Sequence, residues 1–220
     1  AAVVATVALV GVVGWWWQRA APAERDDAAS PLLQRAAYYA GIGQRDDNER
    51  AIALYRQRLQ EAPDDRAAQV GLSRAFAARA CQYSGTPDDA VHAQTLAERV
   101  LAVEPRNAAA HAALGYSFDC RGRVDDALRG YERAVQLDPG ADGARGSAAY
   151  LYERRGRLAH ALAANFAVRD PARVRFHDIQ VASNLDLLGY TAAAEARYRR
   201  SFQLYPDNVF SNLAWPTFLM

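Results

Sequence analysis

The chain has 220 residues, a net charge of +1 and 51% apolar residues, which is the balance of an ordinary folded protein. A nearly neutral chain has no overall attraction to a polyanion, so nucleic acid is excluded as the expected partner. All 26 of its basic residues are arginine.

The first segment of the chain, residues 1–17, predicts a membrane anchor. It carries no charge and would be about 25 Å long as a helix, slightly less than a bilayer core requires. We expect the span to extend upstream of Ala1, because the sequence does not begin with methionine. The segment ends in Trp15, Trp16 and Trp17, which resemble the aromatic belt at a membrane surface and are followed closely by Arg19. Two alternatives are a signal peptide cleaved after 21–23 and a buried core helix.

Residues 18–31 are small, polar and contain proline, which predicts a linker between the anchor and a folded domain. In this linker, Arg19 and Arg25 are offset by three acids, Glu24, Asp26 and Asp27. The flank is therefore not markedly basic, which favours a non-cytoplasmic position for the domain that follows.

An internal repeat covers the rest of the chain. Alanines recur at steps of 42, 34, 34 and 33 residues, at Ala51, Ala93, Ala127, Ala161 and Ala194. Prolines follow in the same register at Pro63, Pro105, Pro139, Pro171 and Pro206. A period of about 34 residues predicts a solenoid of stacked helical hairpins, since a unit of this size is too small to form a core alone.

The most regular unit, residues 108–141, contains two amphipathic patterns around Gly122. Gly122 can adopt the positive φ that ends a helix, and Pro139 cannot continue the second one. The unit resembles a tetratricopeptide repeat (TPR) at Leu114, Gly115, Phe118, Ala127, Tyr131, Ala134 and Pro139. It departs at its fourth position, where the family usually has tryptophan and this chain has His111.

The resemblance implies an all-α fold, a right-handed TPR solenoid of about five helical hairpins preceded by a transmembrane helix. The units are expected at 32–65, 66–107, 108–141, 142–173 and 174–208, and the second carries about eight extra residues around 81–88. Residues 209–220 are expected to start a further helix that Pro216 interrupts, or to form a C-terminal cap.

The two cysteines, Cys81 and Cys120, lie 39 residues apart near the ends of the first helices of adjacent units. A disulfide between them would stabilise the fold by about 4 kcal/mol in an oxidising compartment. The alternative is two unlinked small core residues, because their Cα atoms can exceed bonding reach.

No catalytic or metal-binding pattern is present in the sequence. The four histidines are dispersed, and there is no phosphate-binding glycine loop and no nucleophile elbow. Four aspartate pairs, at 46–47, 64–65, 88–89 and 125–126, precede or open predicted helices, where they are expected to act as caps. We expect no enzyme activity, no metal, no cofactor and no small-molecule substrate.

The resemblance also implies a binding surface, because the first helix of each TPR pair contributes to a concave wall. The early units offer mostly alanine there, such as Ala36 and Ala37. The residues expected to contact a partner are Arg74, Tyr116, Asp119, Tyr150, Glu153, Arg154 and Asp186. Three of them, Asp119, Glu153 and Asp186, share the twelfth position of successive units, which predicts an acidic row for a basic ligand. The alternative is a solvated face partly neutralised by neighbouring arginines.

These features together predict a scaffold that mediates protein–protein interaction. We expect it to be anchored in a bacterial inner membrane, with its solenoid in the periplasm, and to assemble or stabilise a membrane-associated complex. One alternative is the sensor domain of a transmembrane signalling or transcription regulator. The other is a cleaved periplasmic peptide-binding carrier.

Overall fold

The computed structural model describes residues 30–174, 176–204 and 209–220, and the secondary structure in these ranges is helical. The predicted anchor and nearly all of the predicted linker lie outside them. The α-helices are α2 (Pro31–Ile42), α3 (Arg45–Glu61), α4 (Arg66–Gln82), α5 (Pro87–Val103), α6 (Ala108–Asp119), α7 (Val124–Leu137), α8 (Asp142–Arg154), α9 (Leu158–Phe166), α10 (His177–Leu187), α11 (Thr191–Leu204) and α12 (Val209–Phe218). In the described ranges no helix is long and apolar enough to cross a bilayer.

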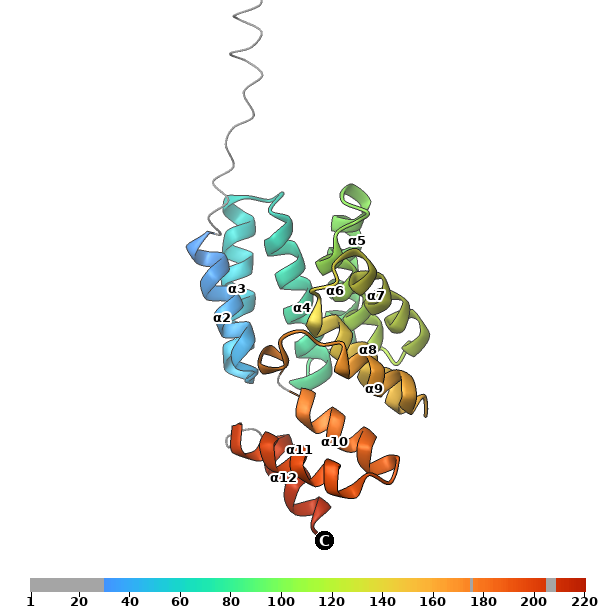
Figure 1. The fold of residues 1–220 in the computed structure, drawn as a ribbon. Coiled ribbons are helices and arrows are strands. Elements are labelled where there is room, and N and C mark those ends of the chain that lie inside the picture. Colours follow the sequence, from blue (N-terminus) through green and yellow to red (C-terminus); the bar gives the residue numbers. More distant parts are fainter. Residues whose placement is uncertain (1–29, 175, 205–208) are drawn as a thin grey trace, which may run out of the picture.

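The helices pack as consecutive hairpins, α2 with α3, α4 with α5, α6 with α7, α8 with α9 and α10 with α11. Each second helix also packs against the first helix of the next hairpin. Helices α10–α12 form one end of the array and the α2–α3 hairpin lies beside α4 (Figure 1). We call the surface formed by the first helices α2, α4, α6, α8 and α10 the inner face.

The alanine period marks the points of close packing in the hairpins. All five alanines, Ala51, Ala93, Ala127, Ala161 and Ala194, are fully buried. At the α6–α7 crossing the backbones approach so closely that a Cβ on Gly130 would lie 2.8 Å from the Gly115 Cα. Small side chains are therefore required wherever two helices of the array meet.

The helix ends follow the local signals of the sequence. The Asp65 carboxylate accepts a hydrogen bond from the Ala68 N–H at 3.0 Å, and Asn107 caps α6 in the same way. Asp89 accepts a hydrogen bond from the Thr86 N–H at the start of α5. The other aspartate pairs lie in the first turns of α3 and α7, as predicted. Gly122 ends the α6 segment with a φ of 71°.

The extra residues of the second unit lengthen its helices. Helices α4 and α5 have 17 residues each, whereas α6 and α7 have 12 and 14. The turn between α4 and α5 contains Ser84 at a φ of 60°. At the end of α4, Cys81 forms a disulfide with Cys120, the residue that follows α6, and their Cα atoms are 5.1 Å apart.

Two boundaries differ from the sequence prediction. Helix α2 begins at Pro31, inside the predicted linker, because proline suits the first position of a helix. Helix α12 continues through Pro216 and ends at Phe218. The interruption expected at Pro216 is therefore wrong: proline removes the backbone hydrogen bond that position 216 would donate to the preceding turn, but it does not end this helix.

Candidate functional site

One side of α4 forms part of the inner face, between α2 and α6. Ala67, Gly71, Arg74, Ala78 and Gln82 are spaced three or four residues apart and therefore lie along one side of the helix. At Gly71 this side contacts Tyr55 of α3, because an added Cβ would lie 2.4 Å from the tyrosine ring. At Gln82 the side-chain amide donates a hydrogen bond of 2.8 Å to the Tyr116 hydroxyl of α6. This side of α4 therefore runs between two tyrosines from neighbouring helices.

Arg74 is exposed on α4, and its charge acts on three tyrosines. Tyr55 and Tyr131 are buried and Tyr116 is half-buried. Burial raises the pKa of each tyrosine, and the Arg74 guanidinium lowers the pKa of each in opposition. Arg74 itself forms no ion pair with any residue that the structure describes. An exposed cation thus lies within electrostatic range of three tyrosine hydroxyls, without an acidic partner of its own.

Asp119, Glu153 and Asp186 have three different environments. Burial raises the pKa of Asp119, and the charge of Arg154 opposes that rise. Glu153 is half-buried and accepts hydrogen bonds from Ser183, at 2.8 Å, and from Asn184, both on α10. Asp186 is exposed and lines a separate cavity. The three carboxylates therefore differ in their availability to a ligand, and Glu153 already joins α8 to α10.

Tyr150 and Arg154 lie together on α8. The Arg154 guanidinium is 5.7 Å from the centre of the Tyr150 ring, and this ring is 43% exposed. The pair forms a cation–π contact at the surface. Ala36, which the resemblance placed on the concave wall, is fully buried in the α2–α4 region. Packing against α3 and α4 removes it from the binding surface.

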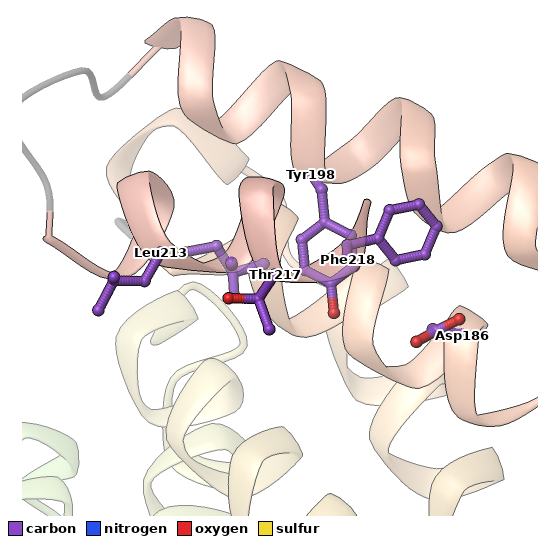
Figure 2. A pocket seen from close by; sticks show the side chains of 7 residues that line it. Asp186, Tyr198, Leu213, Thr217 and Phe218 are labelled. Atoms are coloured by element: carbon purple, nitrogen blue, oxygen red, sulfur yellow. The ribbon is translucent and has the colours of Figure 1, made fainter. Parts of the chain in front are cut away.

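A cavity lies at each end of the inner face. The first, of about 290 Å³, is lined by Leu33, Gln34, Ala37, Tyr55 and Ala67. The second, of about 410 Å³, lies between α10, α11 and α12, and its lining includes Asp186, Tyr198, Leu213, Thr217 and Phe218. Figure 2 shows the Tyr198 and Phe218 rings side by side at this cavity, with their centres 5.1 Å apart. Both cavities are mainly apolar and can accept side chains of a partner.

The sequence analysis assigned Tyr131 to the repeat pattern but did not include the tyrosines of the second helices among the site residues. Tyr55, Tyr131 and Tyr198 share one position of the repeat, with steps of 76 and 67 residues. This regularity was visible in the sequence and is the signal that would have found them. The α12 side chains carried no comparable signal. In the part of the chain that the structure describes, no group of three His, Cys, Asp or Glu residues is arranged to hold a metal ion.

No protein-family model matches the sequence, and no curated protein matches it. Solved structures do match. The TPR protein TTC0263 of Thermus thermophilus is 17% identical with a TM-score of 0.67, over 86% of this chain and 97% of that one. A TPR protein from Parabacteroides merdae is 16% identical with a TM-score of 0.66, over 86% and 70%. YrrB, a TPR protein with an unusual peptide-binding site, is 20% identical with a TM-score of 0.52, over 87% and 93%. At these identities the likeness shows that the fold is a TPR solenoid.

Proposed function

We propose that this chain is a protein-interaction scaffold whose inner face binds a segment of a partner protein. The observation that carries the proposal is the exposed side of α4, where Arg74 has no ion pair with a described residue, Gly71 contacts Tyr55, Gln82 bonds to Tyr116, and Ala67 lines an apolar cavity together with Tyr55. Tyrosine rings offer a large contact area and lose little conformational entropy on binding. The peptide-binding site of YrrB, which has a similar fold, supports the same class of ligand.

The proposal extends to a location at the bacterial inner membrane, with the solenoid in the periplasm. It rests on the uncharged segment 1–17 and its aromatic end, Trp15, Trp16, Trp17 and Arg19. The disulfide between Cys81 and Cys120 supports an oxidising compartment. An anchor would raise the local concentration of the groove at the bilayer, which suits a scaffold that assembles or stabilises a membrane complex.

Site-specific photo-crosslinking of the full chain in cells tests the binding surface. The crosslinker replaces Tyr150 on the inner face or, as a matched control, Tyr190 in the turn between α10 and α11, which is 62% exposed. We expect a discrete crosslinked protein from position 150 and none from position 190. Crosslinking from the control position alone would show that the partner uses another surface.

Extraction of membranes with alkaline carbonate tests the anchor. The full chain is expected to stay with the bilayer, and the double substitution Val7→Asp with Val12→Asp is expected to release it, because charges in the span are costly. Protease added to spheroplasts is expected to degrade the solenoid if it is periplasmic. A solenoid that survives in intact spheroplasts and is degraded only after lysis would contradict the proposed side.

A further inference from the structure

The positive charge of Arg74 on the inner face indicates which chemical groups of a ligand can bind there. Arg74 is exposed on α4 and has no acidic partner among the described residues. Arg79, on the same helix, differs in this respect: it pairs with Glu49 at 3.1 Å and with Asp89 at 2.5 Å. Unpaired guanidinium groups bind carboxylates with two parallel hydrogen bonds, and the attraction is stronger beside buried rings than in open water.

The adjacent cavity specifies a second contact. The cavity of about 290 Å³ is bounded by Ala67 and Tyr55, and the Tyr55 ring reaches Gly71, one turn before Arg74. Ala67 and Arg74 are seven residues apart on α4, or about 10 Å along the helix. An extended peptide covers this length in about three residues.

Other charges of the inner face leave this position available. Asp119 raises the pKa of Tyr116 and Tyr131 but not that of Tyr55, and it has Arg154 as an opposing charge. Glu153 is hydrogen-bonded to α10, and Asp186 lies at the far cavity with Tyr198 and Phe218. Arg74 is therefore available to an acidic group of a ligand beside the apolar cavity between α2 and α4, whereas Asp186 lies at the cavity between α10, α11 and α12.

We propose that the inner face binds an acidic segment of a partner protein, with a ligand carboxylate paired to Arg74 and an apolar ligand side chain, about three residues away, in the cavity between α2 and α4. The inference rests on the proposed function and reverses, at this end of the groove, the basic ligand expected from the sequence. An acidic segment is proposed because its negative charge complements the positive charge of Arg74.

Selection of random twelve-residue peptides on the full chain in detergent tests the ligand chemistry. We expect enrichment of aspartate or glutamate about three residues from leucine, isoleucine or phenylalanine. The variant Arg74→Glu is expected to lose this preference and to weaken binding of a selected acidic peptide at least tenfold. The matched control Arg133→Glu makes the same charge change on the exposed surface of α7 and is expected to leave affinity within twofold.

A charge exchange supplies the decisive comparison. Replacing the ligand acid by arginine is expected to abolish binding to the original chain and to restore it to the Arg74→Glu variant. Basic peptides selected equally by the original chain and the variant would overturn the proposal in favour of the acidic row. If the selected peptides crosslinked to position 150 but showed no preference for acidic residues, the proposed acidic ligand would be wrong and the proposed scaffold function would stand. If no peptide were selected, both the proposed acidic ligand and the proposed scaffold function would be contradicted.

Two other occupants have distinct outcomes. The chain's own acids at 24–27 would be the occupant if the full chain selected acidic peptides only after substitution of Glu24, Asp26 and Asp27 by alanine. A second copy would be the occupant if the full chain formed salt-sensitive dimers in detergent that Arg74→Glu dissociated. Either result would contradict binding of a partner protein at this site.

Discussion

The N-terminal half of the solenoid, α2–α7, and its C-terminal half, α8–α12, share one repeat but are held together differently. In the N-terminal half Asp65 and Asn107 cap helices, and the disulfide joins α4 to the residue that follows α6. In the C-terminal half α8, α9 and α10 begin without a side-chain cap, as α2, α3 and α7 do, no disulfide joins the described helices, and α9 has only nine residues. The two halves therefore share the alanine period, but we expect the N-terminal half to be the more stable of the two.

Buried polar groups show the same contrast. In the N-terminal half, the Asn48 amide donates a hydrogen bond of 3.0 Å to the Ala75 carbonyl. In the C-terminal half, Asn165 is fully buried, and neither of its side-chain amide atoms has a hydrogen-bond partner among the described residues. The His177 Nε2 atom lies 3.0 Å from the backbone carbonyl oxygen of Asn165, and the Nδ1 atom of the same ring has no partner among the described residues. Unsatisfied buried groups reduce stability, so the C-terminal half is expected to unfold first.

Removal of the disulfide is expected to have the largest effect. The double substitution Cys81→Ser with Cys120→Ser should lower the free energy of unfolding of the N-terminal half by about 4 kcal/mol, because it opens a loop of roughly forty residues. Hydrogen exchange, followed by mass spectrometry, should quicken in α4 and α6 and stay unchanged in α10 and α11. Equal changes in both halves would show that the solenoid unfolds as one cooperative unit.

The two buried asparagines offer a matched comparison. Asn165→Leu is expected to raise the free energy of unfolding by about 1–3 kcal/mol, because it removes a buried amide without partners. Asn48→Leu is expected to lower it by a similar amount, because the Ala75 carbonyl loses its donor. Urea unfolding measures both. A destabilising Asn165→Leu would mean that the amide has a partner in solution.

Glycine substitutions test the close packing of the first half against an open position in the second. Gly130→Ala places a Cβ 2.8 Å from the Gly115 Cα and is expected to cost about 1–2 kcal/mol, after the gain in helix propensity is subtracted. Gly143→Ala, in α8, meets no atom within 4 Å and is expected to be neutral or slightly stabilising. Thermal unfolding of the two variants provides the comparison. A Gly130→Ala variant more stable than the original chain would contradict the close packing of α6 against α7.

The smallest expected effect is the acid sensitivity of the N-terminal half. Burial favours a higher pKa for Asp89, but hydrogen bonds from the Arg79 side chain and the Thr86 N–H outweigh it and lower the pKa below its ordinary value of 3.8. A lowered carboxyl pKa stabilises the fold above the unfolded value, and this contribution is lost as the pH falls through the folded pKa. Urea midpoints measured between pH 6 and pH 3 should fall less for Asp89→Asn than for the original chain. Asp88→Asn controls for the loss of one charge, and an identical slope in all three chains would rule out this role of Asp89.

The sequence by itself determined the repeat and the ends of many helices. Ala51 and its four equivalents must be small because helices cross there, and Gly122 and Asp65 act within a few residues of their own positions. Such constraints are local or periodic, so they can be recognised in one chain. Arg74, Tyr116, Tyr150 and Arg154, which the sequence analysis expected to contact a partner, lie on first helices at half-buried or exposed positions, and their role in binding remains a prediction.

Only the tertiary structure decided which side chains meet across helices. It brought Tyr55 and Tyr131 from the second helices into electrostatic range of Arg74, and it bonded Glu153 to α10. It also placed Cys81 within bonding distance of Cys120. These contacts depend on the crossing of helices from different units, and the repeat period specifies the spacing of the units along the chain but not the partners that each side chain finds.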